Sequence, residues 1–142
     1  MASRPVVTPM APGDVLKPRE LILGVTIGRS SRAYPSAVLR DQRVILDDLD
    51  DVPMALILSE DDRSVRVLDR RIDGCTLDLY AVEGSWPLQL VDGQTGSTWD
   101  FSGRATAGEL LGQPLARLAV LPEYWFDWKT WHPASTVYQP GG

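Results

Sequence analysis

The chain has 142 residues and a formal net charge of −5, with 44% hydrophobic and 23% charged residues. This balance is typical of a globular protein, and the negative charge argues against nucleic acid and anionic membranes as partners, because both favour a basic surface. One cysteine and one histidine exclude an internal disulfide and any metal site that needs several thiolate or imidazole ligands, so we expect no metal and no cofactor.

The N-terminal residues 1–19 are rich in proline and are predicted to form an extended arm, because proline removes backbone donors and fixes φ. Residues 20–140 are expected to form a single β-rich domain. No apolar run approaches 18 residues, so no transmembrane segment is expected. The N-terminus lacks a hydrophobic signal core, which leaves two compartments open: cytoplasmic, or exported if a signal has been removed.

Short apolar segments alternate with turn residues along the rest of the chain, which favours a mainly β fold: a small antiparallel barrel or sandwich with one or two short helical turns. The near-continuous apolar run at 54–59 is expected to be a central strand. The segment 65–72 is expected at a sheet edge or around a bulge, because Arg66, Arg70 and Arg71 interrupt its alternation. Asp73-Gly74 predicts a hairpin, and an acidic turn is expected at 47–51.

The segment from Tyr124 to Pro133 holds three of the five tryptophans and the only histidine. At helical spacing Trp125 and Trp128 share one face, whereas Trp131 lies off that face and is predicted to be the most exposed of the three. We expect a short helical plug that ends before Pro133. The candidate partner-binding residues are Trp131 and three prolines of the arm, Pro5, Pro9 and Pro12.

The loop from Asp92 to Trp99 is the strongest candidate site. Thr95 and Ser97 alternate with Gly96, so both hydroxyls can point the same way from an extended loop. One interpretation is ligand contact; the other is an Asx-type turn in which the carboxylate of Asp92 ties two strands together.

His132 is a possible base, because imidazole titrates near neutrality, and with Ser97 and an aspartate such as Asp127 it would make a nucleophilic triad. The chain has no Gly-x-Ser-x-Gly nucleophile motif, and the alternative is a histidine that caps the aromatic turn. We therefore assign no catalytic residue.

Five motifs occur in one order along the chain: Arg32-Ala-Tyr-Pro, Val44-Ile-Leu-Asp, Asp92 to Trp99, Gly103 to Gly112, and Trp125-Phe-Asp-Trp with His132-Pro. With these motifs in this order, the chain resembles a bacterial family of unknown function, thirty-one seventy-nine (DUF3179), over about residues 23–137. Members of that family usually carry a Cys-Pro-Leu-Cys-Gly type motif after the central strand. Here residues 58–62 read Leu-Ser-Glu-Asp-Asp, so any metal or redox role of those thiols is not available. The resemblance implies a fold rather than an activity, and relatives often look exported.

Two functions follow as hypotheses. The first is a non-catalytic binding or assembly module, an accessory subunit that holds a protein partner or a second copy through its arm and aromatic end. The second is a small-molecule-binding protein or enzyme. The residues of its predicted pocket are Arg32, Tyr34, Asp47, Asp92, Thr95, Ser97, Trp99 and His132.

Overall fold

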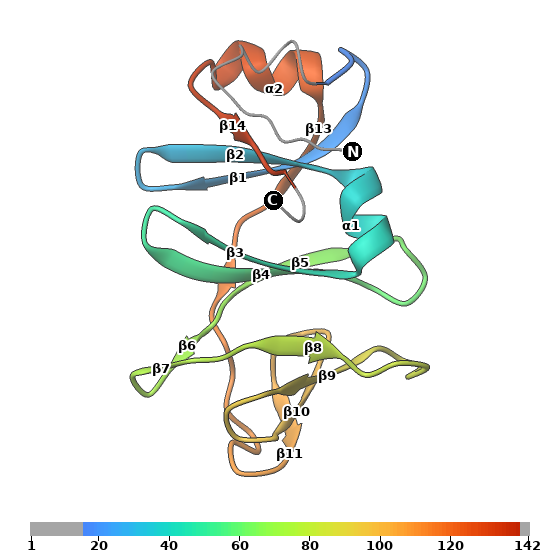
Figure 1. Ribbon diagram of the computed structural model, residues 1–142, viewed down its shortest axis with the longest axis vertical. Coiled ribbons are helices and arrows are strands. Elements are labelled where there is room, and N and C mark those ends of the chain that lie inside the picture. The colour runs from blue at the N-terminus through green and yellow to red at the C-terminus, as the bar shows by residue number, and fades with distance from the viewer. Residues whose placement is uncertain (1–15, 140–142) are drawn as a thin grey trace. The chain divides into compact units, whose positions relative to one another are not determined.

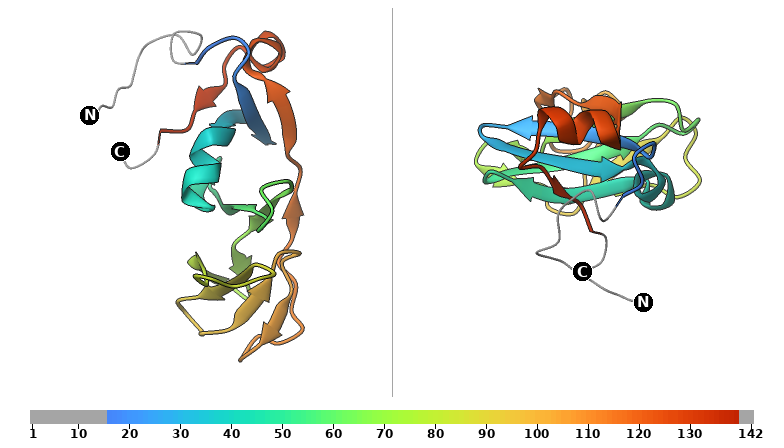
Figure 2. Two further views of the ribbon diagram at one scale, coloured as in Figure 1. Left: turned by 90° about the vertical axis from the view of Figure 1, so that its right-hand side faces the viewer. Right: turned by 90° about the horizontal axis from the view of Figure 1, so that it is seen from above.

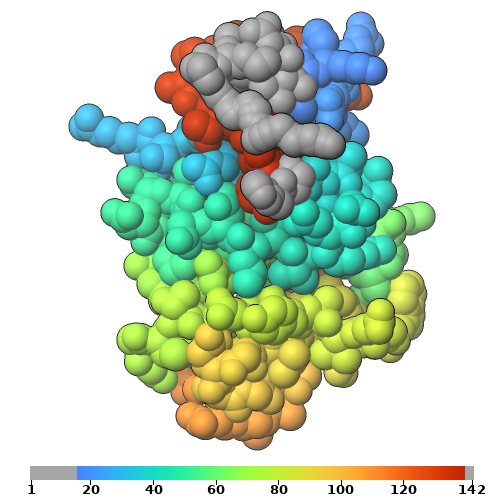
Figure 3. Space-filling view, viewed as in Figure 1, coloured from blue at the N-terminus to red at the C-terminus, as the bar shows by residue number. Residues whose placement is uncertain are grey.

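The computed structural model (Figure 1) describes residues 16–139, the coloured atoms of Figure 3. The chain divides into two compact units: unit 1 combines Met1–Val38 with Val120–Gly142, and unit 2 is Leu39–Ala119. Antiparallel sheets and two short helices confirm the mainly β prediction. Each described helix has seven residues, and none within residues 16–139 is long and apolar enough to cross a bilayer.

Unit 1 is a four-stranded sheet, with order β13-β1-β2-β14, and one helix, α2. Its strands pair antiparallel except for β14, which runs parallel to β2. Strand β13 ends at Tyr124 and helix α2 begins at the next residue, Trp125, with no loop between them (Figure 2). The elements of unit 1 are β1 (Leu21–Ile27), β2 (Ser30–Pro35), β13 (Leu121–Tyr124), α2 (Trp125–Trp131) and β14 (Thr136–Val137).

The core of unit 1 forms where α2 packs on the sheet. Trp125 and Trp128 are buried against Ile22 and Ala33, while Trp131 is 78% exposed, which confirms the prediction for all three tryptophans. Gly24 makes this packing possible, because a Cβ atom there would lie 2.3 Å from the Trp128 ring.

Strand β13 is an edge strand of the described sheet, and Pro122 lies within it opposite Leu23. A proline is tolerated at an edge because no neighbouring strand needs its N–H group. The same residue limits the pairing of a further strand along this edge.

Unit 2 contains two four-stranded sheets, with orders β12-β5-β4-β3 and β11-β10-β9-β8, and a small hairpin, β6-β7. Helix α1 (Ser36–Gln42) joins β2 to β3 along the chain. The strands of unit 2 are β3 (Val44–Leu49), β4 (Val52–Leu58), β5 (Val65–Asp69), β6 (Arg71–Ile72), β7 (Cys75–Thr76), β8 (Leu79–Ala81), β9 (Gln89–Asp92), β10 (Thr98–Asp100), β11 (Ala105–Ala107) and β12 (Arg117–Leu118).

Both sheets of unit 2 contribute to one hydrophobic core, in the manner of a sandwich. Ile57 and Leu68, from the first sheet, lie in one buried cluster with three residues of the second sheet, Leu79, Leu90 and Trp99. Strand β4 lies inside its sheet between β3 and β5, which confirms the prediction of a central strand at this apolar run.

Two local predictions for unit 2 were wrong in part. For the segment 65–72, the sheet-edge alternative fails for β5, because β12 pairs with it at Leu68 and Val67. The strand ends at Asp69, and the chain continues after Arg70 as β6, in a two-stranded sheet. The acidic turn is also shorter than expected. Only Asp50 and Asp51 form it, both with positive φ, as in a two-residue hairpin of type I′. The hairpin predicted at Asp73-Gly74 is confirmed by the β6-β7 pairing.

The substitution Gly24→Ala should lower the free energy of unfolding of unit 1 by about 2 kcal/mol or more, because the new methyl group overlaps the buried Trp128 ring. Urea unfolding followed by tryptophan fluorescence measures the change. Gly93→Ala is the matched control, because its Cβ would meet nothing closer than 3.4 Å. Equal stability of the Gly24→Ala variant and the parent would contradict the packing of Trp128 on β1.

Candidate functional site

The carboxylate of Asp92, at the end of β9, is the centre of the loop that leads to β10. It accepts hydrogen bonds from the Thr95 hydroxyl (2.9 Å), from the Trp99 indole N–H (2.9 Å) and from the backbone N–H groups of Thr95 and Gly96. Asp92 is only 1% exposed. The four residues predicted from sequence therefore do lie together, in the pattern of an Asx-type turn.

The two hydroxyls of the loop are also fully engaged. The Thr95 hydroxyl donates to Asp92, so the Ser97 hydroxyl must donate in the 2.8 Å bond between Thr95 Oγ1 and Ser97 Oγ. Ser97 Oγ also accepts from the Leu110 N–H (3.0 Å), and Ser97 is fully buried. These contacts support the structural interpretation of the loop. Ligand binding by Asp92, Thr95, Ser97 and Trp99 stays a prediction.

The electrostatics of Asp92 favour the ionised form. Burial raises the pKa of its carboxyl, but the hydrogen bonds from Trp99, Thr95 and Gly96 outweigh burial and hold the pKa below its ordinary value. Because the ionised carboxylate accepts four N–H and O–H groups, the charge stabilises the loop and is poorly placed to act as a base.

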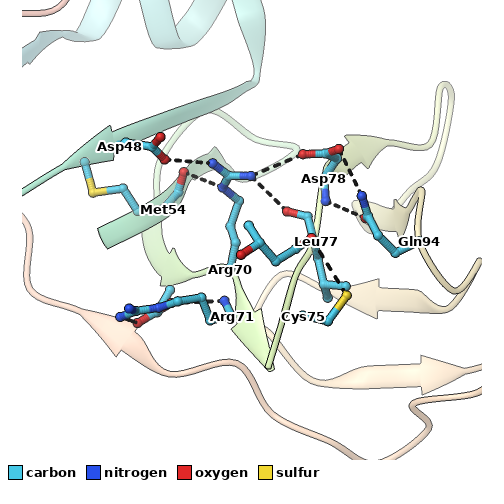
Figure 4. Close-up of polar contacts among 10 residues, drawn as sticks. Asp48, Met54, Arg70, Arg71, Cys75, Leu77, Asp78 and Gln94 are labelled. Atoms are coloured by element: carbon cyan, nitrogen blue, oxygen red, sulfur yellow. Dashed lines mark hydrogen bonds and ion pairs between the residues drawn. The ribbon is translucent and has the colours of Figure 1, made fainter. Parts of the chain in front are cut away.

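Arg70 is the most buried cation of the described residues, at 7% exposure. Its guanidinium donates to the carbonyl oxygens of Met54 on β4 and Leu77 before β8, each at 3.0 Å, and to the carboxylates of Asp48 and Asp78, each at 3.3 Å (Figure 4). These partners come from three separated segments of unit 2. Arg70 is therefore a bridge inside the unit, a role that its sequence neighbourhood of arginines did not reveal.

The network around Arg70 continues to the loop that carries Asp92. Gln94 donates its side-chain N–H to Asp78 (3.0 Å) and accepts from the Asp78 backbone N–H (2.7 Å), as Figure 4 shows. The polar groups of this part of unit 2 thus bind one another.

His132 lies in unit 1, directly after α2. Its ring stacks on Trp128 at a centroid distance of 3.8 Å, and its Nδ1 atom lies 3.4 Å from Ser31 Oγ. Among residues 16–139, no carboxylate forms a hydrogen bond or ion pair with the His132 ring, and Ser97 belongs to the other unit. The contacts favour a histidine that covers the aromatic core, the second of the two interpretations from sequence.

The other predicted pocket residues are also divided between the units. In unit 1, Arg32 Nε donates to Thr136 Oγ1 (2.9 Å) across the β2-β14 pair, and the buried Tyr34 packs against Tyr138 with ring centroids 5.3 Å apart. Asp47 lies on β3 of unit 2. Among residues 16–139, no group of three or more histidine, cysteine, aspartate or glutamate side chains is arranged to hold a metal ion.

Three neighbouring exposed side chains of unit 1 form a second candidate site, which we call the aromatic surface: Leu21, Tyr124 and Phe126. Leu121 and Trp131 are also exposed in the described part of this unit. Leu21 and Tyr124 are direct cross-strand partners on β1 and β13, and the Tyr124 and Phe126 rings stack at 6.2 Å with an interplanar angle of 15°. Each of the three side chains is 41–49% exposed. No local sequence pattern indicates this surface, because residues 21 and 124 become neighbours only through the pairing of β1 with β13.

The predicted partner-binding residues fall in two places. Trp131 is exposed on α2, whereas Pro5, Pro9 and Pro12 lie outside the described residues. Their role in binding stays a prediction.

A family model described as "Protein of unknown function (DUF3179)" matches residues 2–135. The match confirms the resemblance drawn from the five motifs, and it covers segments of both units. No curated protein and no solved structure matches the chain.

The substitution Asp92→Asn should lower the free energy of unfolding of unit 2 by about 2 kcal/mol, because the amide nitrogen cannot accept the bonds that the carboxylate oxygens receive. The pH dependence gives a second measure. With a lowered folded pKa, the ionised carboxylate stabilises fully above pH about 4, and that contribution is lost as the pH falls through the folded pKa. Urea unfolding between pH 2 and about 6 should therefore show that the free energy of unfolding falls less in the variant than in the parent as the pH is lowered.

Asp73→Asn is the matched control for this experiment, because Asp73 lies in an exposed turn with positive φ that asparagine adopts readily. An Asp92→Asn variant with the parent's stability and acid profile would show that the loop does not depend on the carboxylate.

The substitution Arg70→Lys should lower the free energy of unfolding of unit 2 by about 2–4 kcal/mol, because an ammonium group cannot reproduce the planar fork that serves Met54 and Leu77 together. The neighbouring exchange Arg71→Lys is the control, since Arg71 is exposed and pairs only with Asp69 in the described residues. Urea midpoints of the two variants check the difference. Similar midpoints would contradict a bridging role for Arg70.

Proposed function

The chain belongs to the DUF3179 family, whose description assigns no activity, and from this premise we propose that it is a non-catalytic binding module. It holds a protein partner through the aromatic surface of unit 1 and serves as an accessory subunit of a larger assembly. The partner is a different protein or a second copy of the chain.

The observation that carries this proposal is the exposure of Leu21, Tyr124 and Phe126 as one connected group. Tyrosine and other aromatic residues dominate the energy of protein interfaces, because they bury a large rigid area at a small entropic cost. Leu121, on the same strand as Tyr124, and Trp131, on the same helix as Phe126, are further exposed apolar side chains of unit 1.

The edge of the sheet supports recognition through side chains rather than by an added strand. Pro122 removes one backbone donor from β13, so a partner strand would find an incomplete row of hydrogen-bonding groups. A stable interface needs about 800 Å² from each partner, which is more than three side chains supply. The aromatic surface is therefore the centre of a larger contact area.

A small-molecule pocket has less support. Asp92 and Ser97 direct their polar atoms into bonds within their own loop, and His132 packs on Trp128. The polar atoms of Asp92 and Ser97 are thus used within the loop and not offered to a substrate, so we propose no second function.

The test places the photo-cross-linker p-benzoylphenylalanine at position 126 in the cells that make the protein. Irradiation should give a discrete adduct with one protein, identified by mass spectrometry and then purified for titration. Tyr124→Ser should weaken that complex at least tenfold, about 1.4 kcal/mol, because it removes an aromatic side chain from the centre of the interface.

Trp86→Ser is the matched control, because Trp86 is a 73% exposed aromatic residue of unit 2. Circular dichroism should show the fold of both variants unchanged. Loss of binding in the control to the same degree as in Tyr124→Ser, or no adduct at position 126, would contradict the proposal.

A further inference from the structure

We propose that the partner of the aromatic surface is a protein that presents a short acidic segment, in which carboxylates flank apolar side chains. This inference rests on the proposed function and names the chemistry of its partner. The aromatic surface buries the apolar side chains of the segment, and three cations of unit 1 bind its carboxylates: Lys17, Arg19 and Lys129.

The two units of the chain carry opposite net charges. The described residues of unit 1 hold five lysine and arginine side chains and three carboxylates, a net charge of +2. Unit 2 holds eight cations and fifteen carboxylates, a net charge of −7. The aromatic surface therefore belongs to the cationic unit of an acidic chain, and a partner of complementary charge is acidic.

Two of the cations lie beside the aromatic surface, on either side of Pro18 in the chain. The Pro18 carbonyl oxygen accepts from the Phe126 backbone N–H at 2.8 Å, so Lys17 and Arg19 are each one residue away from that contact. Both side chains are exposed. Lys129 follows Phe126 by three residues in α2, and residues at this spacing are neighbours on a helix surface. Two separate segments thus bring cations to the edge of the aromatic surface.

These cations have no acidic partner within the described structure. None of the three forms an ion pair or a side-chain hydrogen bond with residues 16–139, whereas Arg70 and Arg71 of unit 2 each pair with aspartate. A cation without an internal partner can bind an external carboxylate without first losing a bond. The apolar side chains next to it would exclude water from the contact and strengthen the attraction.

The three carboxylates of unit 1 are less accessible than the two cations beside Pro18. Glu20, Glu123 and Asp127 are each half-buried. Glu123 is the cross-strand partner of Ile22, and successive side chains of a strand point to opposite faces, so Glu123 lies on the face of the sheet away from Tyr124. The fully exposed charges next to the aromatic surface are therefore positive.

The charge of unit 2 decides between a protein segment and a membrane. Cations beside apolar side chains are also typical of proteins that bind an anionic membrane surface. A bilayer presents negative charge over an area larger than the whole chain, so it would repel unit 2 with its net charge of −7. A short segment needs to contact only the aromatic surface and the cations beside it, and charges beyond about 8 Å are screened at physiological salt.

The experiment selects peptides of about 12 residues from a random phage-displayed library on the purified full-length chain, and removes those that also bind the Tyr124→Ser variant. The remaining peptides should combine a net charge of about −3 or lower with leucine or aromatic residues. Replacing the carboxylates of the tightest peptide by amides should weaken its binding about tenfold, and Arg19→Glu should do the same. Fluorescence anisotropy measures each dissociation constant.

Arg29→Glu is the matched control, because it makes the same change of charge at an exposed arginine in the turn between β1 and β2. It should change the dissociation constant of the same peptide by about twofold at most, since the turn lies at the other end of β1 from Leu21. Circular dichroism should show the parent's fold in both arginine variants.

Four results would overturn the inference. Selected peptides that are neutral or basic, or equal weakening by Arg19→Glu and Arg29→Glu, would do so and leave the proposed function standing. A dimer in sedimentation that Tyr124→Ser dissociates would assign the surface to a second copy of the chain. Binding to phosphatidylserine vesicles that Tyr124→Ser abolishes would assign it to a membrane, and would contradict the proposed function as well.

Discussion

The guanidinium of Arg70 is the constraint on which unit 2 depends. A buried charge is tolerated only where it is fully bonded, and Arg70 meets this condition through two backbone carbonyl oxygens and two carboxylates. The carbonyl groups belong to Met54 and Leu77, which lie on different parts of the sandwich. One side chain thereby links β4 to the segment that leads into β8.

Aspartate carboxylates at the turns of unit 2 are likewise charged groups that several hydrogen bonds stabilise. Asp92 binds the loop before β10, Asp100 accepts from Ser102 and Arg104, and Asp69 pairs with Arg71. The pKa of each of the three carboxyls is lowered, which follows from hydrogen bonds to the ionised form. These three carboxylates therefore stabilise the turns and loops in which they lie.

Local patterns predicted much of the fold and little of the site. Glycine and proline marked the strand ends, and helical spacing separated the buried Trp125 and Trp128 from the exposed Trp131. Spacing also placed Asp92, Thr95, Ser97 and Trp99 together, because all four belong to one hairpin. Long-range pairing had no such signal. The burial of Arg70 depends on three segments of unit 2, and the aromatic surface depends on strands that lie about one hundred residues apart in the chain.

The exposed area of unit 1 has a physical consequence. Three large side chains, each about half exposed, hold on the order of 5 kcal/mol of unrealised hydrophobic stabilisation. Association of a separate protein costs an estimated 4–15 kcal/mol in lost translational and rotational freedom, so the surface alone cannot hold one. The same three residues can therefore hold a partner only when that partner adds contacts around them.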